Sequence, residues 1–370
     1  MHYGKTFGAG LAAVIMSVSG AAAEEPFSLD ALIAAAKAEP PVQVYDSTGK
    51  IVEMAEAFTA AYGVKAVGQK MKAGEQLEMV AREAQAGNVQ ADVSVIADAP
   101  AALAQLLPHG FVVSWVPPDL AANIPAGYQD PLVIVTSANI WTYNTEIYDS
   151  CPVTNIWQLT EPEWHGKIAM QDPLGKSVFT DWFNQMEAHG DAAVAEAYEA
   201  QYGKPLDTSG ESATKQWVRA LAANAPLLGS SDSNAADAVG APGQSEAFMG
   251  LMSSAKFRDN ADKDYKLGLC ADLKPWPGFT TVGVGLIAAG SDSPNASKLF
   301  IRYMLTPEGI APQAVDGKKS SNSAIKLPAD EPSGVEAVWD QLQGYDLSTA
   351  LDDWDTRQDW QDFWRLNYTR

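Results

Sequence analysis

The sequence contains few of the side chains that most often carry catalysis. Among its 370 residues are two cysteines and four histidines, and the three histidines beyond the N-terminal segment are widely spaced. No G-x-S-x-G or H-E-x-x-H pattern occurs, and neither cysteine lies beside a histidine that could act as a base. The stretch GVGLIAA (283–289) resembles a dinucleotide-binding fingerprint, but Ala288 stands where a third glycine is needed. We therefore predict that the protein is not an enzyme and uses no cofactor.

Basic residues are also scarce. There are 25 lysines and arginines against 46 aspartates and glutamates, which gives a formal net charge of -21. Such a chain repels nucleic acid and anionic lipid, so neither is an expected partner. A net negative charge of this size is typical of a highly soluble protein, and this is the interpretation that we favour. It does not exclude an anionic ligand, because nearby donors and helix ends set the local field of a pocket.

Long apolar runs are missing, except for one at the N-terminus. Lys5 precedes an apolar run over 7–18, and three alanines at 21–23 precede the charged Glu24. This layout predicts a cleaved signal peptide, residues 1–23. A run of about a dozen residues is too short for a membrane helix, which needs roughly 20, so a retained anchor is the weaker alternative. We predict a periplasmic protein that is not inserted in the membrane.

The two cysteines are an even count in an oxidising compartment. A single disulfide between Cys151 and Cys270 is the simplest prediction, and two free buried thiols are the alternative. Neither cysteine has a second cysteine or a histidine cluster at the spacing of a zinc site. We therefore expect no bound metal at these positions.

The first half of the chain alternates short apolar runs with helical patterns. VQVYD (42–46) leads into an amphipathic segment that Gly63 should end, and ADVSVIAD (91–98) leads into a helix with Pro100 in its first turn. Asp98 is placed to cap that helix. This order predicts an α/β fold with parallel sheets, whose ligand sites lie at the carboxyl ends of strands.

The second half is richer in helical patterns. After it, FTTVGVGLIAAG (279–290) predicts a strand, and the next helix should end before Pro307 and restart there. The tail after Gly334 reads as amphipathic helices packed on the body, and a partner-binding tail is the alternative. Four tryptophans support this interpretation of the tail: Trp339, Trp354, Trp360 and Trp364.

The order of segments resembles a known family, the periplasmic solute-binding proteins of ABC transporters, in the group that includes ferric-iron binders. Six stretches, in chain order, carry the resemblance: VQVYDSTGK, AFTAAYGVKA, REAQAGNVQADVSVIAD, WTYNTEIY, LTEPEWHGKIAMQDP and SPNASKLFIRYMLTPEGI. The resemblance implies a two-lobed fold of the type II kind, in which each lobe is a mostly parallel sheet flanked by helices and hinge strands join the lobes. It also implies a monomer that binds a small solute and delivers it to an inner-membrane permease.

The resemblance sets the expected domain limits. The hinge crossings should fall near 133–139 and 280–286. The expected parts are lobe 1 (24–136 plus about 276–315), lobe 2 (137–275) and a C-terminal helical extension (316–370).

The predicted ligand contacts lie where strands end and helices begin. A helix N-terminus with nearby hydroxyls or a lysine suits an anion, while the alternative for each position is capping or ordinary loop structure. The candidates of this kind are Tyr45, Ser47 and Thr48 in the first lobe, and Gly175, Lys176, Ser177 and Ser231 in the second.

The stretch GLMSSAKF (250–257) distinguishes two kinds of solute. Ferric-iron binders of this group carry two adjacent tyrosines here, whereas this chain has Ser253 and Ser254, which suit phosphate, phosphonate, carboxylate or sugar oxygens. Tyr143 matches a tyrosine that some iron binders use as a ligand, and Trp276 could wall the cleft; both could instead be packing residues. We predict an anionic or polyoxygenated organic solute, with ferric iron as the alternative.

Overall fold

The computed structural model describes residues 1–2, 4 and 26–369. The predicted signal peptide falls almost entirely outside these residues and stays a prediction. Within the described part of the chain, no helix combines the length and apolar character needed to cross a membrane.

The described residues form one continuous sheet of eleven strands, with the main order β2-β1-β3-β10-β5-β8-β6-β7. Parallel pairs join β1 to β2 and β3, and join β6 to β7 and β8, as the alternation of strands and helices predicts. The strands are β1 (Val42–Asp46), β2 (Ala66–Lys70), β3 (Val93–Ile96), β4 (Val112–Val113), β5 (Val133–Asn144), β6 (Ile168–Gln171), β7 (Leu227–Gly229), β8 (Met249–Ser253), β9 (Leu267–Leu269), β10 (Gly278–Ala288) and β11 (Lys319–Ser320).

Helix ends follow the local signals in the sequence. Gly63 ends α2 at a φ of 65°, which a residue with a side chain rarely adopts, and the side chain of Asp98 accepts a hydrogen bond from the Ala101 amide to cap α4. The α-helices are α1 (Leu29–Ala36), α2 (Lys50–Tyr62), α3 (Ala73–Ala86), α4 (Ala99–Gln105), α5 (Ser177–His189), α6 (Asp191–Tyr202), α7 (Ala213–Ala223), α8 (Asp232–Gly240), α9 (Asp259–Asp262), α10 (Pro294–Met304), α11 (Pro307–Ala314) and α12 (Ala350–Asn367).

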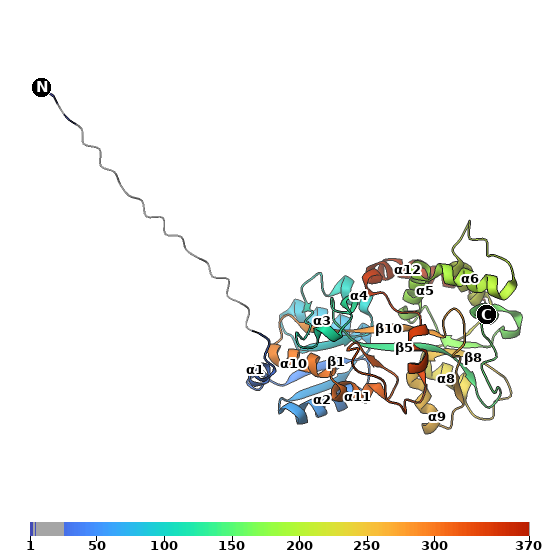
Figure 1. The fold of residues 1–370 in the computed structure, drawn as a ribbon, viewed down its shortest axis with the longest axis horizontal. Coiled ribbons are helices and arrows are strands. Elements are labelled where there is room, and N and C mark those ends of the chain that lie inside the picture. Colours follow the sequence, from blue (N-terminus) through green and yellow to red (C-terminus); the bar gives the residue numbers. More distant parts are fainter. Residues whose placement is uncertain (3, 5–25, 370) are drawn as a thin grey trace.

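Two lobes share this sheet, and the two longest strands run from one lobe into the other (Figure 1). We use "first lobe" for β1 to β4 with α1 to α4, α10 and α11, and "second lobe" for β6 to β9 with α5 to α9. β5 and β10 pair antiparallel from Val133–Val284 to Ile140–Gly278 and join the lobes. The predicted two-lobed fold with hinge strands is confirmed, whereas the exact domain limits stay a prediction because the sheet has no break.

The C-terminal helix packs on the second lobe. Trp360 and Trp364 on α12 belong to the same buried apolar cluster as Phe183 of α5 and Trp217 of α7. Figure 1 shows α12 lying beside α5 and close to α4 of the first lobe. α12 therefore sits where the two lobes meet.

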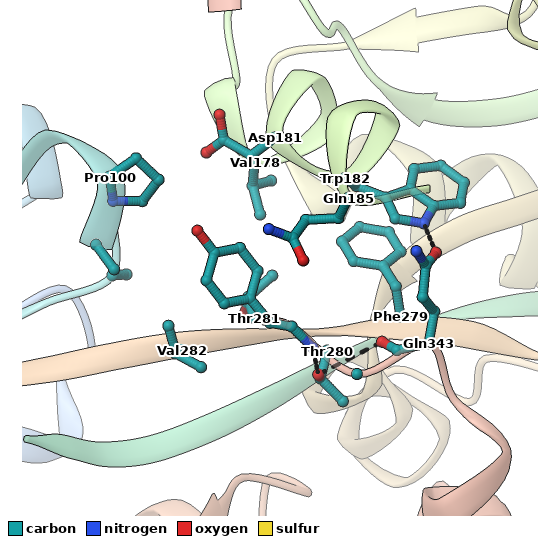
Figure 2. A pocket seen from close by; sticks show the side chains of 14 residues that line it. Pro100, Val178, Asp181, Trp182, Gln185, Phe279, Thr280, Thr281, Val282 and Gln343 are labelled. Atoms are coloured by element: carbon teal, nitrogen blue, oxygen red, sulfur yellow. Dashed lines mark hydrogen bonds between the residues drawn. The ribbon is translucent and has the colours of Figure 1, made fainter. Parts of the chain in front are cut away.

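A small apolar cavity lies on this side of the boundary between the lobes (Figure 2). Trp182 of α5 stacks on Phe279 of β10 with ring centroids 4.4 Å apart, and its indole N–H donates to Gln343 Oε1 at 2.8 Å. Ala99 and Pro100 of α4 supply the first-lobe wall. We call this space the apolar interlobe cavity.

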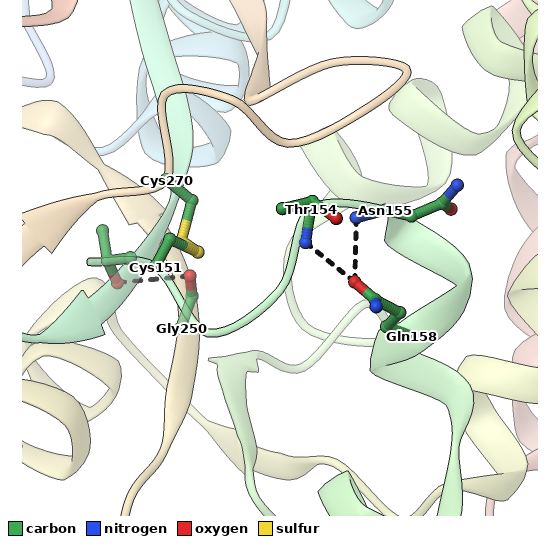
Figure 3. Close-up of a disulfide and its surroundings, with 7 residues drawn as sticks. Cys151, Thr154, Asn155, Gln158, Gly250 and Cys270 are labelled. Carbon is green, nitrogen blue, oxygen red and sulfur yellow. Dashed lines mark hydrogen bonds between the residues drawn. A yellow bond between two sulfur atoms is a disulfide. The ribbon is translucent and has the colours of Figure 1, made fainter. Parts of the chain in front are cut away.

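The predicted disulfide is confirmed. Cys151 and Cys270 are bonded with an S–S distance of 2.06 Å (Figure 3). The bond closes a loop of 119 residues in sequence separation, and a loop of that length stabilises a fold by about 5 kcal/mol in the chain-entropy description. Beside it, Gln158 Oε1 accepts hydrogen bonds from the amides of Thr154 and Asn155, at 2.7 and 3.1 Å.

Candidate functional site: a basic cleft between the lobes

A wide cleft lies between the two lobes, where strands of each lobe reach their carboxyl ends. The loop after β1 and the end of β2 form one wall, and the end of β8 with the start of α8 forms the other. The cleft encloses about 1120 Å³, including its mouth. Its lining residues are Ser47, Thr48, Gly49, Lys50, Lys70, Asp232, Ser253, Ala255, Lys256, Arg258, Asp316 and Lys318.

The lining of this interlobe cleft has the opposite charge to the whole chain. Five of its side chains are basic and two are acidic, whereas the protein carries a formal charge of -21. Of the acidic pair, Asp316 is bonded to Arg258 at 2.7 Å across the boundary between the lobes. Basic groups come from both walls, so a bound anion would meet positive charge on either side.

The second acidic residue is surrounded by lysines. Burial raises the pKa of the Asp232 carboxyl, while the charges of Lys176 and Lys256 lower it. The charge of Lys176 thus acts on Asp232 in the cleft wall, although Lys176 itself does not line the cleft. Lys256 Nζ also donates to Ser233 Oγ at 2.9 Å, which orients the lysine along the start of α8.

A buried carboxylate holds the loop after β1. Burial raises the pKa of Asp46, and Lys318 lowers it. Asp46 accepts hydrogen bonds from the Thr48 amide and from Gln313 Nε2, both at 3.2 Å. These bonds fix residues 47–50 at the edge of the cleft.

Ser47 contributes a hydroxyl that forms no hydrogen bond with the described residues. Its Oγ is buried and has no hydrogen-bond partner there, and the residue lines the cleft. Buried polar groups normally have a partner, so this hydroxyl is suited to a ligand oxygen. Thr48 Oγ1, by contrast, accepts from the Lys50 amide at 3.3 Å and so helps to start α2.

The predicted site residues that are not aromatic fall into two groups. Ser47, Thr48 and Ser253 line the cleft, and Lys176 lies close enough to act on it. The others serve turns, caps or contacts between elements: Gly175 closes a turn on the Asp172 carbonyl, Ser177 donates to Asp98 at 3.2 Å, Ser231 bonds to Asn234 at 3.0 Å, and Ser254 is buried beside Gly317.

Three aromatic residues that were predicted as ligand contacts lie away from the cleft. Tyr45 packs with Met71 and Ala91, because its side chain lies on the side of β1 that α3 covers. Tyr143 packs in the second-lobe core against Gly268, and Trp276 packs against Gly190 at the end of α5. All three occupy the packing positions that were the alternative to ligand contact, and their role as ligand contacts stays a prediction.

Sequence reasoning missed the basic residues that give the cleft its charge. Lys50 and Lys70 follow the same strand-end rule that selected Ser47, so that rule could have found them. Lys256 and Arg258 follow Ser253 and form part of the turn η5 (Ser254–Arg258). Lys318 follows α11, and only the fold brings it to β1.

The cleft lining offers little to a bare metal ion. It contains no histidine or tyrosine, and elsewhere in the described part of the chain no group of three or more His, Cys, Asp or Glu side chains is placed to hold a metal. Serine and lysine side chains are poor ligands for Fe(III), which prefers anionic oxygen, and the two carboxylates of the lining already face basic side chains: Asp316 pairs with Arg258, and Asp232 lies near Lys176 and Lys256.

Two lobes joined by two long strands, with a polar cleft between them, define the class of periplasmic binding proteins. The family model described as "Bacterial extracellular solute-binding protein" matches residues 42–317, and the chain belongs to this family. A comparison with curated protein sequences gives no match.

Solved structures share the fold at low sequence identity. Iron-bound HitA from Pseudomonas aeruginosa matches with a TM-score of 0.64 and 16% identity, over 86% of this chain and 99% of that one. AfuA from Actinobacillus pleuropneumoniae, with exogenous fructose-6-phosphate bound, gives 0.63 and 18%, over 88% and 98%. An ABC transporter substrate-binding protein from Agrobacterium tumefaciens gives 0.63 and 16%, over 90% and 95%.

Proposed function

We propose that this protein is the periplasmic binding component of an ABC importer for a small anionic organic solute, of the phosphonate or phosphorylated sugar or alcohol type. The observation that carries the proposal is the basic interlobe cleft in a strongly acidic protein. Phosphate and phosphonate oxygens are acceptors, and the lysine, arginine and serine side chains of the lining supply donors for them. The protein then delivers the solute, without chemical change, to an inner-membrane permease.

Capture follows from the placement of these donors on both walls. Lys50, Lys70 and Lys318 lie on the first lobe, and Lys256 and Arg258 lie on the second. When the lobes approach, water leaves the cleft and each charge-assisted hydrogen bond acts in a lower dielectric. Separation of the lobes exposes the same groups to water and releases the solute.

Ferric iron is the second candidate, favoured by the fold of HitA, whose structure is described as iron-bound. Iron binding here would need a synergistic anion, because the cleft lining contains no tyrosine or histidine. Tyr143 is the tyrosine expected from the resemblance, but it packs in the second-lobe core.

The test is native mass spectrometry of the mature protein, purified as a monomer from cells without refolding and compared with its denatured mass. A retained organic anion would support the proposal and give the solute class. A mass excess that matches iron, with a visible absorption band, would overturn it, and loss of that band in Tyr143→Phe would assign the ligand. A cleaved product of the retained molecule would instead indicate catalysis.

A further inference from the structure

A single arginine on the C-terminal helix bonds to both lobes. Arg357 Nε and Nη2 donate to the two carboxylate oxygens of Asp181 on α5, at 3.0 and 2.8 Å. Nη2 and Nη1 donate to the carboxylate of Asp98, which caps α4 in the first lobe, at 2.9 and 3.3 Å. The guanidinium is therefore held by one carboxylate from each lobe.

α12 itself is fixed to the second lobe. Asp353, one turn before Arg357, is fully buried and accepts hydrogen bonds from Asn184 at 2.7 Å, Gln185 at 2.8 Å and the Tyr345 hydroxyl at 2.8 Å. Trp360 and Trp364, on the following turns, lie in the second-lobe core. We therefore expect Arg357 to move with the second lobe if the lobes separate, a movement that would also part Ala350 and Trp354, at the start of α12, from the first-lobe cluster in which they pack.

The contact with Asp98 differs from the ion pair that Arg258 and Asp316 form between the lobes. The Arg357 side chain is 14% exposed and has two carboxylate partners, whereas the Arg258 side chain, which pairs with Asp316, is 43% exposed. Ion pairs that are shielded from water and bidentate contribute more than exposed single contacts, and breaking one leaves a charge without its partner. Ser177 Oγ adds a third donor to Asp98, again from the second lobe.

We propose that Arg357 is a positioning residue that holds the closed arrangement of the lobes, staying on Asp181 and releasing Asp98 when the cleft opens. The proposal rests on the function proposed above, since it assumes that the lobes open and close around a solute. Arg357 contacts no residue that lines the first-lobe wall of the interlobe cleft. It sets the population of the closed state and so the affinity for whatever the cleft binds.

The test measures the distance between the lobes in the absence of solute. Spin labels on Glu56→Cys and Glu199→Cys, at exposed positions on α2 and α6, report that distance by pulsed electron resonance, and the disulfide leaves no other cysteine free. In Arg357→Ala, the ratio of short to long distances should fall by about tenfold. Asp98→Asn should give the same shift, because asparagine still caps α4 but carries no charge. Arg357→Lys should restore part of the short-distance population.

Arg302→Ala is the matched control. Arg302 on α10 makes two hydrogen bonds to Asp119, at 2.8 and 2.7 Å, entirely within the first lobe. Its removal should lower the melting temperature without changing the distance between the labels. An unchanged distance in both Arg357→Ala and Asp98→Asn would overturn the proposal and leave Arg357 a purely structural residue. The measurement needs no solute, so its failure is separate from a failure to find a bound anion.

Discussion

The two spaces between the lobes have opposite chemistry. The interlobe cleft encloses about 1120 Å³ and is lined by lysine, arginine and serine side chains, whereas the apolar interlobe cavity encloses about 370 Å³ and is lined by Trp182, Phe279 and Val282 among others. A polar cleft can exchange water for a solute at modest cost, because its groups are satisfied in either state. Stacked aromatic rings lose their contacts outright if they part. The comparison indicates that the cleft is the variable side, which binds and releases a solute, and that the cavity lies on the packed side, where apolar packing and the Arg357–Asp98 contact hold the lobes together.

The packed side should show the largest effect on stability. Trp182 is buried, stacks on Phe279 and donates to Gln343. Trp182→Ala should lower the free energy of unfolding by about 3–5 kcal/mol, because it removes a large buried ring and leaves Gln343 without its donor. Urea unfolding followed by circular dichroism measures this loss.

Trp182→Phe is the control for the ring alone. It keeps most of the stacking surface and removes the indole N–H, so its cost should be about 1 kcal/mol. A loss below 1 kcal/mol in Trp182→Ala would mean that the aromatic packing beside the apolar cavity contributes little to stability, and the contrast between the two spaces would fail.

A substitution in the interlobe cleft, the variable side, should instead weaken solute binding and leave the free energy of unfolding almost unchanged. Lys256→Ala removes one donor of the cleft and should weaken binding of the retained solute by roughly 10- to 100-fold, the value of a charge-assisted hydrogen bond of about 1.5–3 kcal/mol. Its effect on the free energy of unfolding should stay within about 0.5 kcal/mol, because the side chain is partly exposed.

Titration calorimetry with the retained solute measures the affinity of Lys256→Ala, and Lys298→Ala is its matched control. Lys298 lies on α10, over the Trp115 ring. Its substitution removes the same positive charge at a position away from the cleft. Equal affinity in Lys256→Ala and Lys298→Ala would show that net charge, rather than the cleft, governs binding.

The sequence predicts the parts of this molecule that depend on local pattern. Strand β1, the stop of α2 at Gly63, the cap at Asp98 and the restart of a helix at Pro307 all follow from neighbouring residues, and all are present. The disulfide follows from a count of two cysteines. The two-lobed fold follows from the resemblance carried by the order of the segments.

The charge of the cleft could not be predicted in the same way. Lys318 reaches the cleft only because α11 returns to the first lobe after β10, so its neighbour Asp46 is far away in sequence. The aromatic residues are open to two interpretations for a related reason: a tyrosine beside a strand end suits either a ligand or the core, and the side of the strand it occupies decides between them. Likewise, no local pattern places Arg357 between Asp98 and Asp181.

Over a single pH unit, the smallest expected effect is a dependence of stability on pH at the boundary beside the apolar cavity. Burial raises the pKa of the Asp181 carboxyl to about 8, and the charges of Asp98 and Asp353 add to this, while Arg357 acts in the opposite direction. The guanidinium of Arg357 is shared between Asp181 and Asp98, so it offsets only part of the cost of burying the Asp181 charge. In the unfolded chain the same carboxyl titrates near its ordinary pKa of about 4.

The sign of the effect follows from proton binding. Between about pH 4 and about pH 8 the folded protein holds a proton on Asp181 that the unfolded chain has released, and above about pH 8 Asp181 is the carboxylate that pairs with Arg357. This contribution to stability is therefore complete below pH 4 and declines as pH rises through about 8. Between pH 7 and pH 8 the free energy of unfolding should fall by about 1 kcal/mol from this group. Asp181→Asn should remove that slope, whereas Asp316→Asn, which changes the carboxylate that pairs with Arg258 at the cleft, should keep it. If the slope instead follows Asp316, the titrating group that matters lies at the cleft, and the division of the boundary into a variable and a packed side would have to be redrawn.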